Sequence, residues 1–358
     1  MKKLIAIVLA LVMVLSMAAC GAKSEPAPAP EAPKAEAAAP AAPEAPAEPA
    51  APALPGEGFK VALIASSSGL GDRSFNDAAW SGFNKAEAEL GVEIKVVEPK
   101  DVADYVSSAS ALADAGYQLI FATGSDWADA LAQAAALYPD VKFVGLNVNA
   151  EGDNIAIART ADHQIGFLVG CLAAMMSESG TVGYIGGKEN ASQIRFNTAY
   201  VEGATYANEN INVLTAWAGA FNDPAKGKEY ALELINQKAD VIFHTAGQTG
   251  NGLFEAIQEV DGVYAIGVDS NQDYIVEGKV LTTAEKHLAV IAYDMITKLI
   301  NDTFEAGVSI YDLSNDGVGT TEMEFTKDII GAEKLAKLDE IKAGIIDGSI
   351  KVTDTFAN

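Results

Sequence analysis

Short apolar runs alternate with longer amphipathic stretches along almost the whole chain after residue 58. The short runs are rich in Val, Ile and Ala and are bounded by Gly, Asp or Ser, which is typical of buried parallel strands, whereas the longer stretches repeat apolar residues at helical spacing. The regular alternation of strands and helices predicts an α/β fold with doubly wound parallel sheets. The predicted strands are 59–65, 93–97, 119–123, 143–147, 182–185, 213–217, 241–245, 264–268 and 279–283. The predicted helices are 74–90, 102–115, 127–136, 165–177, 197–208, 225–236, 251–259, 287–300 and 334–346.

The alternation of strands and helices falls into two series, the second of which begins after Arg159. Residues 58–358 number 301. At that size a single hydrophobic core tends to split into two. We therefore expect two α/β lobes.

The N-terminus has the pattern of an export signal. Two lysines precede an uncharged apolar run, residues 4–19, which is too short for a comfortable membrane span. The run ends in the letters MAACG around Cys20, which resemble a bacterial lipobox. We predict a lipoprotein signal peptide over residues 1–19 and acylation of Cys20, and simple secretion is the alternative. The predicted location is the cell membrane, on its extracytoplasmic side.

Residues 20–57 have a different composition from the rest of the chain. After Cys20 they are almost entirely Ala, Pro, Glu, Gly and Lys, and 10 of the 13 prolines lie between positions 26 and 55. Such a segment cannot bury apolar surface, so we predict an extended tether. Cys171 is the one other cysteine in the sequence. It leaves no intrachain disulfide for an exported protein, and its apolar neighbours indicate a small buried side chain.

The charge balance narrows the choice of ligand. The chain has 24 Lys and Arg against 49 Asp and Glu, a net charge of −25, of which residues 58–358 carry −23. A field of this sign opposes nucleic acid and other polyanions, so we expect no nucleic-acid partner. For the same reason a neutral ligand is favoured over a phosphorylated one.

Polar residues and aromatic rings follow many of the predicted strands. Because ligands of open α/β sheets bind outside the carboxyl ends of the strands, these segments are the candidate site. They combine small residues, carboxylates or amides, and aromatic side chains, which suit a neutral, hydroxylated ligand with a flat ring. The segments are 66–76, 124–127, 147–149, 186–187, 218–223, 246–250, 269–271 and 284–286.

The sequence lacks the usual motifs of catalysis and cofactor binding. The stretch 69–74 begins like a dinucleotide fingerprint but lacks its third glycine, and the chain has neither a phosphate-binding loop nor a nucleophile elbow. Its three histidines are far apart in sequence, outside any metal-ligand spacing. We therefore predict a protein that is not an enzyme and that needs no cofactor and no metal.

Five blocks of residues occur in the order seen in the basic membrane protein family of bacterial lipoproteins, which the chain resembles from residue 58 to about residue 330. The blocks are 71–77 with Trp80, 166–170 with 173–174, 182–187, 221–228 and 267–272. The family includes purine nucleoside receptors that deliver their ligand to ABC importers. The resemblance implies an α/β type I periplasmic-binding-protein fold, in which two doubly wound parallel-sheet lobes are joined by three crossovers. We expect residues 58–158 and 284–304 in one lobe and residues 159–283 and 305–358 in the other.

The resemblance also implies roles for single residues in a site between the lobes. Phe75 and Phe221 match the two aromatic faces that sandwich a purine. Asp269 and Lys286 match the positions that bind the ribose hydroxyls, and Asp126 matches an acid that hydrogen-bonds the base. The full expected set is Asp72, Phe75, Asn76, Asp126, Trp127, Phe221, Asp269 and Lys286. Trp127 caps the pocket in one interpretation and packs in the first turn of a helix in the other.

The predicted function is that of a lipid-anchored solute receptor of an ABC importer, which binds a purine nucleoside and acts as a monomer with permease subunits as partners. A receptor of the same fold for a sugar or another small polar metabolite is the alternative. Some of these residues also have possible structural roles that involve no ligand. Asp72 and Asp126 are candidate helix caps, and Phe75 and Phe221 are candidate core residues.

Overall fold

The computed structural model describes residues 53–356. The predicted signal peptide, Cys20 and the tether up to residue 52 lie outside the described residues. Within residues 53–356, no helix has the length and hydrophobicity that crossing a membrane requires. Two six-stranded sheets organise this part of the chain, and we call each sheet with its covering helices a lobe.

The first lobe is built on an all-parallel sheet. Its strands are β1 (Lys60–Ile64), β2 (Glu93–Val97), β3 (Leu119–Thr123), β4 (Lys142–Leu146), β5 (Ile155–Thr160) and β11 (Gly307–Tyr311). They lie in the order β11-β5-β4-β3-β1-β2. Its helices are α1 (Phe75–Leu90), α2 (Tyr105–Asp114), α3 (Ala128–Leu137) and α8 (Leu288–Ile300), with single turns η1 (Val102–Asp104) and η2 (Ser125–Trp127).

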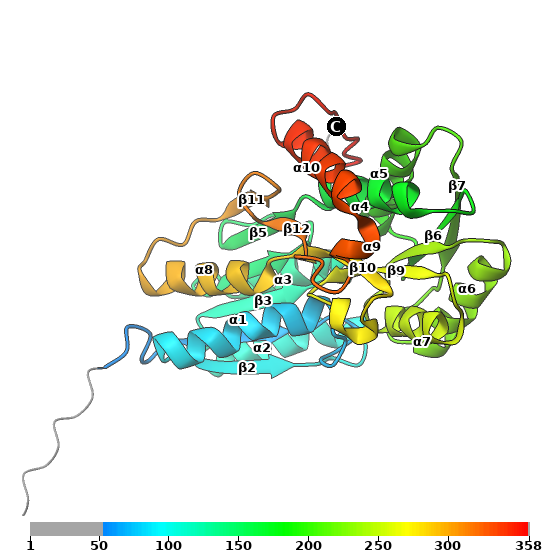
Figure 1. The fold of residues 1–358 in the computed structure, drawn as a ribbon. Coiled ribbons are helices and arrows are strands. Elements are labelled where there is room, and N and C mark those ends of the chain that lie inside the picture. Colours follow the sequence, from blue (N-terminus) through cyan, green and yellow to red (C-terminus); the bar gives the residue numbers. More distant parts are fainter. Residues whose placement is uncertain (1–52, 357–358) are drawn as a thin grey trace, which may run out of the picture. The chain divides into compact units, whose positions relative to one another are not determined.

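Helices cover both faces of this sheet, which explains the continuous apolar run of β1. Val61 and Leu63 point to the core beneath α1 and α8, while Ala62 and Ile64 point to the core beneath α2 and α3. Successive residues of a strand face opposite sides, so both faces need apolar residues. Figure 1 shows α1 in blue beside α8 in orange, two helices that are far apart in sequence. Their close approach requires Gly82, where a Cβ would overlap the backbone of Ala289.

The second lobe has a sheet of mixed direction. Its strands are β6 (Thr181–Gly186), β7 (Asn212–Trp217), β8 (Val241–Thr245), β9 (Tyr264–Asp269), β10 (Val280–Lys286) and β12 (Val318–Thr320). They lie in the order β12-β10-β9-β8-β6-β7, and β12 alone runs antiparallel to its neighbour. Its helices are α4 (Asp162–Met176), α5 (Ala191–Ala207), α6 (Pro224–Asn236), α7 (Asn251–Glu259), α9 (Lys327–Ile330) and α10 (Ala332–Ile346), with turns η3 (Gly247–Gly250) and η4 (Asp273–Val276).

The chain passes between the lobes three times. It crosses from β5 to α4, from β10 to α8, and from β11 to β12. The α/β fold with two parallel-dominated sheets and three crossovers is therefore confirmed. Cys171 is fully buried in the core of the second lobe, as its apolar neighbours predict.

Three strands, β5, β11 and β12, are missing from the predicted set. β5 follows β4 without a helix between them, so it breaks the alternation on which the prediction depends. β11 forms an edge of its sheet, where Val308 and Ile310 are exposed, and it lacks the buried pattern of its neighbours. β12 has three residues, too few for a periodic signal.

The expected lobe boundaries are wrong at two places. Residues 284–286 belong to the second lobe, because β10 continues to Lys286 in that sheet, three residues beyond the predicted strand end. Residues 307–311 belong to the first lobe, because β11 pairs with β5 and completes the edge of that sheet. A pairing between strands this far apart in sequence leaves no local pattern.

Candidate functional site

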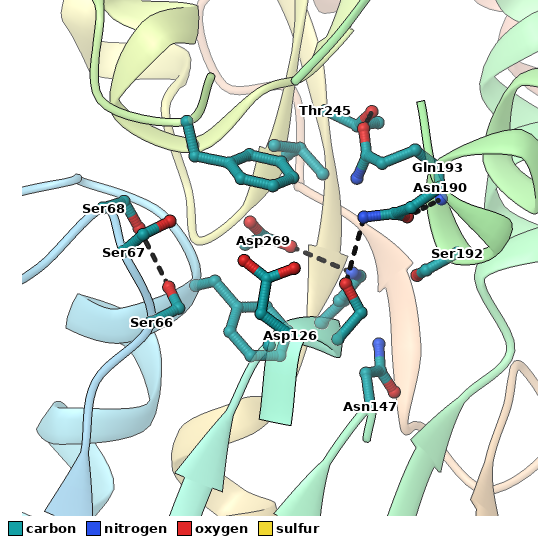
Figure 2. Close-up of a pocket in the computed structure, with 17 residues that line it drawn as sticks. Ser66, Ser67, Ser68, Asp126, Asn147, Asn190, Ser192, Gln193, Thr245 and Asp269 are labelled. Carbon is teal, nitrogen blue, oxygen red and sulfur yellow. Dashed lines mark hydrogen bonds and ion pairs between the residues drawn. The ribbon is translucent and has the colours of Figure 1, made fainter. Parts of the chain in front are cut away.

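A pocket lies at the carboxyl ends of the strands, and residues of both lobes line it. About 670 Å³ of space lies between its walls, part of which opens to solvent. The walls carry mainly hydroxyl, amide and carboxylate groups together with two phenyl rings, and Figure 2 shows the polar groups around the cavity. The lining comprises Ser66, Ser67, Ser68, Phe75, Gly124, Ser125, Asp126, Asn147, Asn190, Ser192, Gln193, Phe221, Thr245, Gly247, Val268, Asp269 and Lys286.

The two aromatic rings enter the pocket from different lobes. Phe75 is the first residue of α1, in the first lobe, and Phe221 lies in the loop after β7, in the second. Both are half-buried, so neither is part of a closed core. Phe221 can take its place only because position 187 is a glycine: a Cβ there would overlap the phenyl ring. The structure thus brings both predicted aromatic residues into one pocket, each from a different lobe.

A buried ammonium group joins two carboxylates at one wall. Lys286, the last residue of β10, has its Nζ 3.2 Å from Asp269 Oδ1 and 3.4 Å from Asp162 Oδ1. Burial acts to lower the pKa of the lysine, but the two carboxylates outweigh it and hold the pKa above its ordinary value. The Nζ also lies 5.0 Å from the ring centre of Phe75. The wall therefore carries a fixed positive charge between two acids.

Asp269 is held in an unusual backbone conformation. It ends β9 with φ at +70°, in the left-handed region that few residues other than glycine occupy without strain. Ser74 donates a hydrogen bond to Oδ2 from the other lobe. Oδ1 is buried, and the Lys286 ammonium group lies 3.2 Å from it. A carboxylate oxygen has more than one lone pair, so Oδ1 can accept from a ligand in addition to its contact with Lys286.

Asp126 lines the pocket from the turn η2 of the first lobe. Its Oδ2 is 2.8 Å from Lys188 Nζ, which belongs to the second lobe. Beside this ion pair, Asn190 Nδ2 donates to Ser125 Oγ at 3.0 Å, a second contact between the lobes. The Lys188 ammonium group also lies 5.8 Å from the ring centre of Phe221. Asp126 is thus a lining carboxylate that is fixed from the second lobe.

Asp72 lies behind the wall of the pocket and not in it. Its carboxylate accepts hydrogen bonds from the backbone N–H groups of Ser74 (2.9 Å) and Asn76 (3.0 Å) at the start of α1. Burial raises its pKa to about 6, although these backbone bonds act in the opposite direction. Asp72 therefore caps the start of α1, which is the structural role that the sequence analysis gave as the alternative to ligand contact.

Asn76 and Trp127 also lie outside the lining. The amide of Asn76 is fully buried and links three segments: it accepts from Ser66 N–H and Thr123 Oγ1 and donates to Ser68 Oγ. Trp127 is buried in the first-lobe core, where its ring stacks on Tyr105 with centres 4.0 Å apart. The expectation of direct ligand contact is therefore not met at these positions. The local sequence does not distinguish a tryptophan that packs in the first turn of a helix from one that contacts a ligand. The same holds for an aspartate that caps a helix, so these residues were expected in the site.

Five of the expected site residues share the pocket: Phe75, Asp126, Phe221, Asp269 and Lys286. Several lining residues were missed. Ser66 to Ser68 and Asn147 lie in segments that the sequence singled out, but no feature distinguished them within those segments. Asn190, Ser192 and Gln193 were missed because α5 begins at Ala191, six residues before the predicted start. Asn190 caps this helix by accepting from Gln193 N–H, and the spacing Asn-x-x-Gln is a signal that could have placed the helix start.

The fold and the pocket define a two-lobed α/β binding protein, with a ligand site at the strand ends where the lobes meet. The chain belongs to the Bmp family, described as PnrA-like ABC transporter substrate-binding proteins, whose profile matches residues 59–355. This confirms the resemblance to the basic membrane protein family. It also confirms a substrate-binding protein of ABC transporters in place of an enzyme.

Individual relatives agree with this assignment. The chain is 31% identical over 315 residues to the ABC transporter nucleoside-binding protein BmpA of Lactococcus lactis subsp. cremoris, covering 82% of this chain and 88% of that protein. It is 33% identical over 301 residues to basic membrane protein A of Borreliella burgdorferi, covering 82% and 87%. The crystal structure of ABC transporter system solute-binding proteins from Aeropyrum pernix K1 has a TM-score of 0.78 at 24% identity, covering 83% of this chain and 93% of that chain. The last comparison supports the fold.

Proposed function

We propose that the protein binds a purine nucleoside in this pocket and delivers it to an ABC importer. The observation that carries the proposal is the combination of two phenyl rings, one from each lobe, with a buried carboxylate and ammonium group in the same cavity. A nucleoside has the matching parts, a flat base and a sugar with adjacent hydroxyl groups. The name of the Lactococcus relative, a nucleoside-binding protein, supports the same choice.

The base fits between Phe75 and Phe221. Offset stacking contributes about 0.5 to 1.5 kcal/mol for each aromatic pair beyond the burial of apolar area. Because the rings belong to different lobes, the sandwich is complete only when the lobes are closed on the ligand. Stacking therefore couples occupancy of the site to closure.

The sugar fits against Asp269 and Lys286. A carboxylate can accept from two adjacent hydroxyl groups, and hydrogen bonds to charged groups are about twice as strong as those between neutral groups. A ribose hydroxyl would add a second donor to Asp269 Oδ1, beside the Lys286 ammonium group at 3.2 Å. A phosphate group would meet the carboxylates of Asp126 and Asp269, so the pocket favours a nucleoside over a nucleotide.

Calorimetric titration of the purified protein with guanosine, inosine, adenosine, ribose and arabinose tests the proposal. We expect a nucleoside to bind with a dissociation constant of about 1 µM or less, which corresponds to about −8 kcal/mol. If no nucleoside gives a binding heat and a pentose does, the nucleoside function is wrong, and the alternative, a sugar receptor of the same fold, is favoured. Conversion of a bound nucleoside to free base would contradict a receptor role altogether.

We further propose that Cys20 carries the lipid that attaches the protein to the outer side of the cell membrane, and that the protein is a monomer in contact with permease subunits. Metabolic labelling with a palmitate analogue tests the anchor. We expect label in the wild type and in Cys171→Ala, which removes a buried thiol, and none in Cys20→Ala. Label that persists in Cys20→Ala would refute the proposed anchor.

A further inference from the structure

Most amide side chains in the pocket are occupied by the protein itself. Asn147 accepts from Thr160 N–H and donates to Thr160 Oγ1, and Asn190 accepts from Gln193 N–H and donates to Ser125. Such groups shape the wall but offer a ligand little that is not already paired. An amide whose oxygen is already hydrogen-bonded to the protein is different, because the NH₂ group that remains can only donate a hydrogen bond to a ligand.

Gln193 is such an amide. Its Oε1 accepts from the backbone N–H of Gly187 at 3.2 Å and from the Thr245 hydroxyl at 2.6 Å. The backbone N–H can only donate, so the oxygen must lie on this side and the NH₂ group on the other. Figure 2 shows the amide of Gln193 between Thr245 and Asn190, with its nitrogen directed into the cavity. Among residues 53–356 this nitrogen has no hydrogen-bond acceptor.

Asp126 offers the complementary group from the other lobe. Lys188 engages its Oδ2, whereas Oδ1 has no hydrogen-bond donor among the described residues. The carboxylate accepts hydrogen bonds and cannot donate while it is ionised. Besides the pair of Lys286 and Asp269, the pocket therefore presents a donor, Gln193 Nε2, and an acceptor, Asp126 Oδ1, on elements of different lobes.

We propose that Gln193 is a specificity-determining residue, which together with Asp126 selects a ring that carries a hydrogen-bond acceptor beside an N–H donor. This inference rests on the proposed nucleoside function and narrows it to the 6-oxopurine nucleosides, inosine and guanosine. Their O6 accepts and their N1–H donates. Adenosine has a donor NH₂ at position 6 and an acceptor at N1, so the same pose would bring donor to donor and acceptor to acceptor.

The comparison of ligands on the wild-type protein is the first test. Inosine, adenosine and purine riboside share the sugar and the fused ring and differ in the acceptor at position 6 and the proton at N1. We expect inosine to bind at least about tenfold more tightly than either of the others, because an unpaired polar group in a closed site is costly. Equal affinities for inosine and adenosine would overturn this inference alone. If no nucleoside binds, the proposed function fails and the inference fails with it.

The second test exchanges the donor for an acceptor. In Gln193→Glu one oxygen can still accept from Gly187 and Thr245, but the atom that faces the cavity becomes an acceptor. We expect inosine binding to weaken at least about tenfold and the ratio of inosine to adenosine affinity to fall by a similar factor. The matched control is Gln258→Glu, which makes the same charge change on an exposed side chain of α7 and should leave the ratio unchanged. An unchanged ratio in Gln193→Glu would show that this residue does not select the base.

Discussion

Replacement of Lys286 by Met tests the central electrostatic feature of the site. The lysine side chain is 7% exposed and lies between the carboxylates of Asp162, 1% exposed, and Asp269, 7% exposed. Met fills a similar volume but removes the charge. Two buried carboxylates would then face each other across the same wall without a cation between them.

The expected loss of stability follows from this burial. Removal of one partner of a buried ion pair leaves a charge without compensation and typically costs about 3 to 5 kcal/mol. A comparable exposed pair provides the scale: Lys298 Nζ is 2.7 Å from Asp294, yet both side chains are more than a third exposed. For Lys298→Met we expect a loss of about 0.5 kcal/mol or less, because solvent screens that pair.

Urea unfolding, followed by circular dichroism in the absence of ligand, measures both variants against the wild type. The raised pKa of Lys286 means that its contribution is fully present below the ordinary lysine pKa and is lost only as the pH rises through the higher folded value. The deficit of Lys286→Met should therefore be constant between about pH 7 and pH 9. Adding Asp269→Asn should recover part of it, since one of the two uncompensated charges is removed.

A loss below about 1 kcal/mol for Lys286→Met would refute the reasoning, because it would mean that the two carboxylates do not depend on the lysine. A large loss that Asp269→Asn leaves unchanged would also refute it. That result would assign the effect to the lost contact of the ammonium group with the rings of Phe75 and Phe196, whose centres lie 5.0 Å and 4.8 Å from Nζ.

Three further predictions concern the rings, the lobe contacts and the loop before α1. Phe221→Ala should weaken nucleoside binding at least about tenfold in calorimetry, whereas Tyr274→Ala, at a ring that is 56% exposed, should not change it. Ser270→Ala removes the hydrogen bond of 2.9 Å from Ser270 Oγ to the Arg73 carbonyl in the other lobe. It should weaken all nucleosides by the same small factor, and a change in their ranking would contradict a contact that serves closure alone. Burial raises the pKa of Asp72 to about 6, so its contribution to stability is lost as the pH rises from its unfolded pKa toward that value. Relative to Asp72→Asn, the wild type should therefore lose about 2 to 3 kcal/mol between pH 4 and pH 8 in urea unfolding, and a constant difference would refute this assignment.

The sequence was sufficient for the elements whose signal is local. Strands such as β3 and β8 are buried on both faces, and their runs of apolar residues, 119–122 and 241–243, can be recognised without a partner. Aromatic residues in polar loops, Phe75 and Phe221, were also recognisable, because neither belongs to an apolar stripe. These features depend on the chain within a few residues of each position.

Features that depend on distant pairing could not be predicted in the same way. The edge strand β11 exists because β5 offers it a partner, and Asp162 matters because the chain returns with Lys286 beside it. The different roles of Asp72 and Asp269 are a further example. Both aspartates adjoin turns near the start or end of a regular element, yet one caps α1 behind the wall and the other lines the cavity. Only the direction of the side chain in the folded protein distinguishes them.

Affinity and selectivity have separate physical origins in this pocket. Arg73 and Asp269 both adopt left-handed backbone conformations, and both take part in hydrogen bonds between the lobes, through the Arg73 carbonyl and the Asp269 carboxylate. Positive φ values at such residues cost free energy that the surrounding contacts must offset. In the proposed nucleoside complex, the ligand adds to those contacts whatever its base, so this part of the affinity would be common to all nucleosides. In the proposed complex, selectivity comes from atoms that meet the base edge with a fixed hydrogen-bonding character, and we assign this role to Gln193 Nε2 and Asp126 Oδ1.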